Sequence, residues 1–166
     1  CSSSDVAGIN RGQITELIEC SAVSDLLKMG YCMGPDCTKP SSLISDGGIK
    51  NSGYAIKAFA AGADYVIMGG YFARSLDAET HLHGDGTYFG CASEKQNTLA
   101  GLDKHSEGKN LLIERSELKS TEKLVSDLWG GLSSGVSYTG YKSLTELIGN
   151  GIFEIKQNSL PPKSRS

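Results

Sequence analysis

The amino-acid sequence predicts an α/β fold built around a parallel sheet, and three observations lead to this prediction. Two short apolar segments, 43–45 and 65–68, are followed by paired glycines, Gly47–Gly48 and Gly69–Gly70. A segment with an alanine-rich helical pattern, 52–61, lies between them. The chain also contains 21 glycines in 166 residues, roughly twice the usual share. An alternation of strand, glycine turn and helix is the order of elements in a parallel α/β sheet.

The elements around these strands follow from the same periodicity. Apolar residues at helical spacing predict an amphipathic helix over 12–27, and a polar loop over 34–42 follows it. The helix between the strands, 52–61, has Ser52 as its candidate N-cap, and Gly62 supplies its stop. Both strands are predicted to be buried.

Beyond the second pair of glycines, from 76 to about 121, the periodicity fades. This segment is predicted to be a long excursion with short ordered pieces, and excursions of this length are uncommon unless they carry function. A helical pattern returns over 121–129, is predicted to stop at Gly130–Gly131, and resumes over 142–148. The polar tail, 158–166, is predicted to be disordered.

Composition argues against several classes of protein. A net charge of −3 gives no general attraction to nucleic acid or to an anionic membrane, so a bound phosphate must be held by placed groups. No apolar stretch approaches the roughly 20 residues that span a bilayer, and residues 1–5 show no signal-peptide pattern. The five cysteines are odd in number and irregularly spaced, as expected for free thiols in a reducing cytosol. Cys32 and Cys37 lie too far apart for a common zinc knuckle, and His81 and His83 are expected to be solvated loop residues.

The two glycine pairs form a candidate phosphate site. In a parallel sheet, ligands bind at the C-terminal ends of the strands, where glycine lets backbone N–H groups close on phosphate oxygens. Two such turns on neighbouring strands could share one phosphate, and Asp46 could accept hydrogen bonds from ribose hydroxyls. The alternative is that the glycines only form tight turns between strand and helix, and the residues alone leave both interpretations open.

The order and spacing of several motifs resemble those of a known family. Ile44-Ser45-Asp46-Gly47-Gly48 and Val66-Ile67-Met68-Gly69-Gly70 are similar to the C-terminal region of the IMP dehydrogenase/GMP reductase family. Cys1-Ser2-Ser3-Ser4 resembles the catalytic cysteine loop of that family. Residues 88–94 and Ser106-Glu107-Gly108-Lys109 resemble segments of its GMP reductases. The resemblance covers nearly the whole chain except the tail.

The resemblance implies an α/β fold that is the C-terminal portion of a (β/α)8 TIM barrel. In the family the cysteine loop follows the sixth strand, so residues 1–157 would form a partial TIM-barrel catalytic domain with a mobile active-site flap at about 76–120. A complete barrel needs about 250 residues. The isolated chain is therefore expected to be inactive and unstable, because apolar faces and strand edges would be uncovered.

The implied activity is that of a cytoplasmic GMP reductase, which converts GMP to IMP and ammonia with NADPH through a covalent cysteine–purine intermediate. Cys1 is the expected nucleophile, and Ser3 and Glu107 are the expected acid–base pair for the loss of ammonia. From the residues alone, Cys1 is more readily a structural or accidental thiol, and an exposed loop carboxylate stays open for Glu107. The resemblance also implies a homotetramer that binds GMP or IMP, and the composition predicts no nucleic-acid or membrane partner.

The remaining site residues are implied by the same resemblance. The residues expected to bind the substrate are Asp46, Gly47, Gly48, Gly69, Gly70, Gly90, Cys91, Ala92, Lys104, Ser106 and Gly108. Those expected to contact NADPH are Cys91, Ser134 and Ser137. A potassium ion is expected on the backbone carbonyls of Cys1 and Ser4.

Two observations favour a reductase over an IMP dehydrogenase, which converts IMP to XMP with NAD. No arginine precedes a tyrosine anywhere in the chain, whereas dehydrogenases of this family use an Arg-Tyr pair to activate water. The segment 106–109 also matches the reductases. A diverged, non-catalytic paralogue that binds purine nucleotides stays open, because the chain departs from the family pattern at several positions. These positions are Ser3, Tyr54, Cys91, Ala92 and Lys104.

Overall fold

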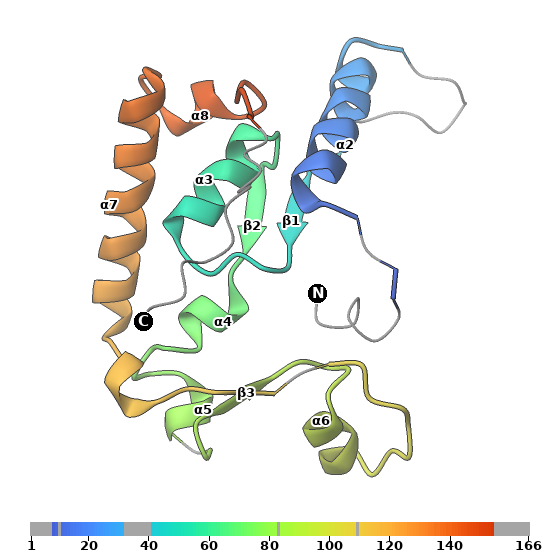
Figure 1. Cartoon of the computed structure of the whole chain (residues 1–166), viewed down its shortest axis with the longest axis vertical. Helices are drawn as coiled ribbons and strands as arrows, with labels where there is room; N and C mark the ends of the chain where they lie inside the picture. The colour runs from blue at the N-terminus through green and yellow to red at the C-terminus, as the bar shows by residue number, and fades with distance from the viewer. Residues whose placement is uncertain (1–7, 10, 32–40, 83, 109, 155–166) are drawn as a thin grey trace, which may run out of the picture.

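A computed structural model of the chain describes residues 8–9, 11–31, 41–82, 84–108 and 110–154 (Figure 1). Its helices are α2 (Gln13–Lys28), α3 (Ser52–Ala60), α4 (Gly69–Phe72), α5 (Glu79–Leu82), α6 (Glu94–Leu99), α7 (Thr121–Thr139) and α8 (Leu144–Leu147), with a 3-10 helix η1 (Arg115–Glu117). Its strands are β1 (Ile44–Asp46), β2 (Tyr65–Ile67), β3 (Thr87–Phe89) and β4 (Asn110–Leu112).

The strands β1 and β2 pair in parallel, as the sequence predicts. Ile44 lies opposite Tyr65, and Asp46 lies opposite Ile67. Both strands therefore end at the same edge of the sheet, where Figure 1 shows their arrows pointing toward α4. The glycine pairs that follow the two strands are brought side by side by this register.

Helix α3 connects the two strands, and its N-cap differs from the predicted one. The cap is Asn51, whose extended backbone lets its side-chain oxygen accept a hydrogen bond from the backbone N–H of Tyr54 at 3.2 Å. Ser52 is already the first residue of the helix. The amide side chain of Asn51, one residue upstream, satisfies the free N–H of the first turn, so the prediction of Ser52 as the cap was wrong.

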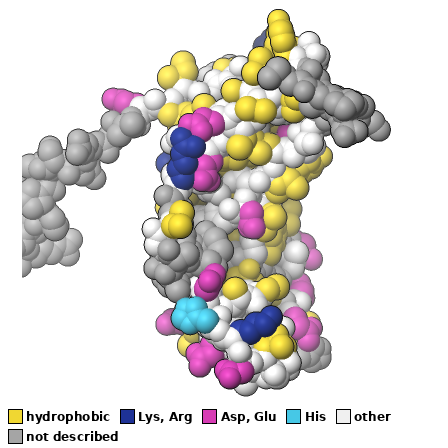
Figure 2. Space-filling model, turned by 90° about the vertical axis from the view of Figure 1, so that its right-hand side faces the viewer, with side chains coloured by type: hydrophobic (Ala, Val, Ile, Leu, Met, Phe, Trp, Pro, Cys, Tyr) yellow, Lys and Arg dark blue, Asp and Glu magenta, His cyan; other side chains and the backbone are white. Residues whose placement is uncertain are grey.

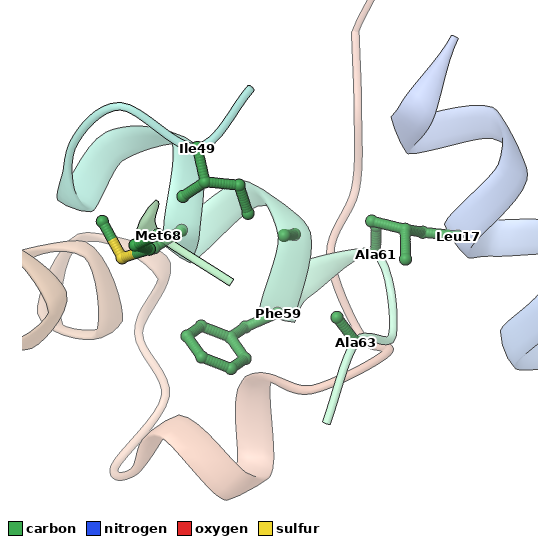
Figure 3. Close-up of a cluster of buried hydrophobic side chains, with 8 residues drawn as sticks. Leu17, Ile49, Phe59, Ala61, Ala63 and Met68 are labelled. Atoms are coloured by element: carbon green, nitrogen blue, oxygen red, sulfur yellow. The ribbon is translucent and has the colours of Figure 1, made fainter. Parts of the chain in front are cut away.

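Half of the residues in the buried core cluster are alanines. Ala55, Ala58 and Phe59 of α3 are buried, and they form one cluster with residues of α2 and of the segments that flank the strands (Figure 3). Alanine side chains let α3 lie close to its neighbours and keep helix propensity high. The buried cluster consists of Leu17, Ile49, Ala55, Ala58, Phe59, Ala61, Ala63 and Met68.

Helix α7 runs through the glycines at which the sequence predicts a stop, and it continues to Thr139. The reason is its contact with α3. A Cβ at Gly131 would lie 2.0 Å from Oγ and 2.4 Å from Cβ of Ser52. One turn later, a Cβ at Gly135 would lie 2.7 Å from the side chain of Ile56. These glycines let the two helix backbones approach closely, so the prediction of a helix end at Gly130–Gly131 was wrong.

The flap, residues 76–118, leaves and rejoins the sheet layer at one place. The backbone N–H of Leu76 donates to the carbonyl of Lys119 at 2.9 Å, and the N–H of Lys119 donates to the carbonyl of Arg74 at 3.1 Å. The hydroxyls of Ser75 and Thr121 lie 2.6 Å apart beside this ladder. Between these ends, β3 and β4 form an antiparallel ribbon that lies beyond the C-terminal ends of β1 and β2 in Figure 1. The predicted long excursion with short ordered pieces is confirmed.

One face of the β1–β2 pair and one face of α2 expose apolar side chains. Ile44, Tyr65 and Ile67 project from the strands and are each about half exposed or more, so the prediction that both strands are buried was wrong for this face. Figure 2 shows hydrophobic side chains on the surface of the α2 side of the molecule, and Val23 and Leu26 are exposed on that helix. Two parallel strands with open edges do not make a self-sufficient sheet. No helix within the described ranges is long and apolar enough to cross a membrane.

We expect the 166-residue chain, produced by itself, to aggregate or to unfold without cooperativity, because its strand edges and apolar faces lack partners. Analytical ultracentrifugation and urea denaturation followed by circular dichroism measure this. A soluble monomer with a single cooperative unfolding transition would contradict the prediction.

We expect Gly131→Ala to lower the free energy of unfolding of the native polypeptide by about 1 kcal/mol or more, because the added methyl group meets Ser52 in the contact between α3 and α7. Gly130→Ala is the matched control in the same helix, since a Cβ there has no neighbour within 4 Å. It should raise the free energy of unfolding by up to about 1 kcal/mol through helix propensity. Urea titration gives both values, and equal effects would argue against the close helix contact.

Candidate functional site

A pocket of about 400 Å³ opens at the C-terminal ends of β1 and β2. It brings together five of the predicted substrate-binding residues, Asp46, Gly47, Gly48, Gly69 and Gly70. Its other lining residues are Ile49, Lys50, Ile67, Tyr71, Arg74, Tyr88 and Leu111. The two glycine turns thus form one concave site at the strand ends, where α/β folds bind ligands.

The first turn is held by the start of α2. The side-chain amide of Gln13 donates to the backbone carbonyl of Asp46 at 3.0 Å and to that of Gly47 at 2.9 Å. Gly47 and Gly48 have φ values of 100° and 71°, a left-handed backbone that favours glycine. Replacing either glycine would therefore strain the turn. The hydrogen bonds of Gln13 fix the start of α2 beside this turn.

The second turn is approached by the flap. Gly69 and Gly70 begin α4, and Tyr88 of β3 reaches over them. A Cβ at Gly69 would lie 2.2 Å from the Tyr88 hydroxyl, so glycine is needed for this approach. The flap therefore contributes one wall of the pocket through Tyr88 and through Leu111 of β4.

Two cationic side chains that the sequence motifs did not single out line the pocket. Lys50 follows the first glycine turn, and Arg74 follows α4. Arg74 Nε forms an ion pair with Glu117 Oε1 at 3.2 Å, and its Nη1 donates to the carbonyl of Gly70. Their signal in the sequence is position alone, since each lies within a few residues of a strand-terminal glycine pair. Sequence periodicity does not tell which way such a side chain points.

Tyr71 ties the pocket to α7. Its hydroxyl donates to the backbone carbonyl of Leu124 at 2.8 Å. Burial raises the pKa of Tyr71 above its ordinary value, and the nearby carboxylate of Asp127 adds to the increase. The phenol is neutral at physiological pH and acts as a fixed hydrogen-bond donor.

A second group of predicted residues meets within the flap. The carbonyl of Ala92 accepts hydrogen bonds from the backbone N–H groups of Glu107 at 3.0 Å and of Gly108 at 2.8 Å. The side-chain amide of Asn97 donates to the carbonyl of Lys104 at 3.1 Å and to the hydroxyl of Ser106 at 3.2 Å. The structure thus places segments 90–92 and 104–108 against each other. None of these residues lines the pocket between the glycine turns.

An ion pair secures this part of the flap. Asp85 lies just before β3, and Lys95 lies in the first turn of α6. The Lys95 Nζ is 2.7 Å from both carboxylate oxygens of Asp85. Lys95, followed by the backbone N–H of Thr87, holds the pKa of the Asp85 carboxyl well below its usual range. The pair stays charged at neutral pH and anchors α6 to the start of β3.

The remaining predicted residues lie elsewhere or outside the described ranges. Cys1, Ser3 and Ser4 lie outside the described residues. Ser134 and Ser137 lie in the second half of α7, and Ser137 is 13 residues beyond Leu124, about 20 Å along the helix axis. Figure 1 shows this end of α7 far from the turn before α6 that holds Cys91. One copy of the chain therefore does not bring the three predicted cofactor residues together.

The surroundings of His81 differ from the expected ones. His81 is half-buried rather than solvated, and its Nε2 lies 2.9 Å from the carbonyl of Ala73, so the ring has a structural contact. His83 lies outside the described residues. No group of three or more His, Cys, Asp or Glu side chains that could hold a metal ion occurs among the residues that the structure describes.

The family model and the similar curated proteins point to the same family. The family model of the IMP dehydrogenase / GMP reductase domain matches residues 1–160. A GMP reductase of Onchocerca volvulus is 33% identical, over 89% of this chain and 39% of the relative. An inosine-5′-monophosphate dehydrogenase of Chlorobaculum tepidum is 32% identical, over 92% of this chain and 32% of the relative. The chain thus spans about two fifths or less of the length of these relatives.

Solved structures give the fold. GMP reductase C318A from Trypanosoma brucei, in complex with guanosine 5′-monophosphate, superposes with a TM-score of 0.65 at 28% identity, over 87% of this chain and 29% of that chain. An IMP dehydrogenase/GMP reductase-like protein from Corynebacterium glutamicum gives a TM-score of 0.72 at 22% identity, over 93% and 39%, and shows the fold alone. Both are TIM barrels, so the prediction of a TIM-barrel portion is confirmed.

We expect Gly69→Ala to displace the flap from the pocket, because its Cβ would lie 2.2 Å from the hydroxyl of Tyr88. Trypsin should then cleave the flap of the native polypeptide faster, as measured by mass spectrometry of the fragments. Adding Tyr88→Phe removes the clashing oxygen and should largely restore slow cleavage. Gly90→Ala, where a Cβ meets nothing within 4 Å, is the control. If Gly69→Ala and Gly90→Ala are cleaved at the same rate, Tyr88 does not pack on the second turn.

Proposed function

Because this chain belongs to the IMP dehydrogenase/GMP reductase family, we propose that it carries the nucleotide site of a GMP reductase, which converts GMP to IMP and ammonia with NADPH. The observation that carries the proposal is the pocket that Asp46 lines together with the two glycine turns. It supplies groups for a phosphate and for a ribose in one cavity. The activity is that of the whole protein, of which this chain supplies the last strands and the flap.

The pocket supports a defined placement of the nucleotide. The phosphate would lie against the turns at Gly47–Gly48 and Gly69–Gly70, because glycine lets backbone N–H groups approach its oxygens. The Asp46 carboxylate, at the end of β1, would accept hydrogen bonds from the ribose hydroxyls. The purine base would then extend toward the cysteine loop, which precedes the start of α2 at the pocket edge.

The chemical steps are assigned to Cys1, Ser3 and Glu107. The Cys1 thiolate would add to C2 of the purine and form a covalent intermediate, and the amino group on C2 would leave as ammonia. The Ser3 hydroxyl and the Glu107 carboxylate would transfer the proton that this departure needs. Glu107 is exposed, and its backbone is held by Ala92 within the flap, so it would reach the base from the flap side.

NADPH, when bound, would supply a hydride to C2, and the Cys1 thiolate would be the leaving group when IMP is released. Cys91, Ser134 and Ser137 are the residues proposed to contact NADPH. Because the two serines lie far from Cys91 in one copy, we place the cofactor between neighbouring subunits of a homotetramer. The serine hydroxyls are exposed, as a contact with a ligand held by another subunit requires. Potassium on the carbonyls of Cys1 and Ser4 belongs to the same proposal.

A second candidate, IMP dehydrogenase, is favoured by the dehydrogenases among the relatives, which match at 32% identity. The lack of an Arg-Tyr pair in the whole sequence argues for the reductase, because the dehydrogenase reaction must activate a water molecule. The departures at Tyr54 and Lys104 leave a third candidate, a diverged protein that binds nucleotides without turnover.

We expect the native polypeptide to oxidise NADPH only when GMP is present, measured as loss of absorbance at the nicotinamide wavelength. Cys1→Ala should abolish this activity without reducing GMP binding by more than a few fold, because the thiol acts in the chemical step. Glu107→Gln should slow turnover by about 100-fold or more. Formation of NADH from NAD⁺ and IMP would instead establish the dehydrogenase, and GMP binding without either reaction would establish the diverged protein.

A further inference from the structure

Two cationic side chains line the pocket between the glycine turns. Lys50 and Arg74 line it, and Asp46 is the single carboxylate among its described lining residues. The lining thus holds two cations and one carboxylate, and Glu117, which lies outside the lining, is paired with one of the two cations, Arg74. The two cations come from different strand–turn units, since Lys50 follows β1 and Arg74 follows β2 and α4.

Arg74 is held in place before any ligand binds. Its Nη1 donates to the carbonyl of Gly70, the second residue of the glycine turn. Its Nε is paired with Glu117 at 3.2 Å, and its side chain is only 28% exposed. The Nη2 amino group has no partner among the described residues. A guanidinium fixed in this way loses little rotamer entropy when it binds an anion.

Lys50 supplies a second and more adaptable charge. It lies two residues after Gly48, and no carboxylate within the described part of the chain forms an ion pair with it. Its ammonium group is a compact point charge on a flexible stem, suited to follow an anion that enters the pocket. Arg74 and Lys50 thus combine a fixed cation with a mobile one around the glycine turns.

We propose that Lys50 and Arg74 bind the doubly charged 5′-phosphate of the ligand and select the nucleotide over the nucleoside. The inference rests on the proposed function for the identity of the ligand, and it adds two residues to the site. Backbone N–H groups of the glycine turns are neutral donors, whereas hydrogen bonds from cations to phosphate are about twice as strong. The carboxylate of Asp46 is repelled by the phosphate, which orients the nucleotide with its ribose hydroxyls toward Asp46.

The test measures affinities of the native polypeptide for GMP, guanosine and inorganic phosphate by isothermal titration calorimetry. The variants are Lys50→Gln, Arg74→Gln and Arg74→Lys, which keeps the charge. Lys57→Gln is the matched control, because Lys57 lies on α3 outside the pocket with its ammonium near the ring of Tyr54. Guanosine affinity reports whether the base and ribose contacts remain folded in every variant.

Lys50→Gln and Arg74→Gln should each weaken GMP binding about tenfold or more and leave guanosine binding unchanged. Arg74→Lys should recover part of the loss, and Lys57→Gln should behave as the wild type. A ratio of GMP to guanosine affinity that stays the same in both glutamine variants would overturn the inference. If the wild type binds inorganic phosphate but no purine nucleotide, the proposed function fails. In that case the inference about the anion site stands only if the glutamine variants lose phosphate binding.

Discussion

The parallel pairing of β1 with β2 is the constraint on which the rest of this structure depends. Because Asp46 lies opposite Ile67, the two glycine turns open side by side and form one pocket. A shift by one residue would turn Asp46 away from the pocket edge and reverse the side chains that face α3. The first turn is also held from outside the sheet, since the Gln13 side chain of α2 donates to two of its carbonyls.

Close helix packing maintains this pairing. The alanines of α3 and the glycines of α7 let the helices lie close together, so that α3 covers the sheet and α7 covers α3. The same glycines show where local interpretation of the sequence fails. Its neighbours in the sequence predict a helix end at Gly131. In the structure, however, Ser52, which is 79 positions upstream, occupies the space that a side chain at Gly131 would need. Tertiary contact overrides helix propensity there.

Some residues of the site could be predicted from their neighbours in the sequence, and others are placed only by the tertiary structure. The turns at Gly47–Gly48 and Gly69–Gly70 could be predicted, because strand, glycine pair and helix follow each other directly in the sequence. Lys50, Arg74 and Tyr88 could not, because each enters the pocket only through the placement of turns and flap in space. Resemblance to the family supplied the residues of the flap, and the structure arranges them in a second group of their own.

The ladder that joins Arg74, Lys119 and Leu76 has an evolutionary consequence. The flap is a closed excursion whose two ends meet, so residues added or removed within it do not move α7 relative to the sheet. Lengthening such a loop costs little, because closure entropy grows only with the logarithm of its length. The sequence and length of the flap can therefore change independently of the rest of the fold. Changes in ligand preference can accumulate there while the strands, the glycine turns and the helix contacts stay as they are.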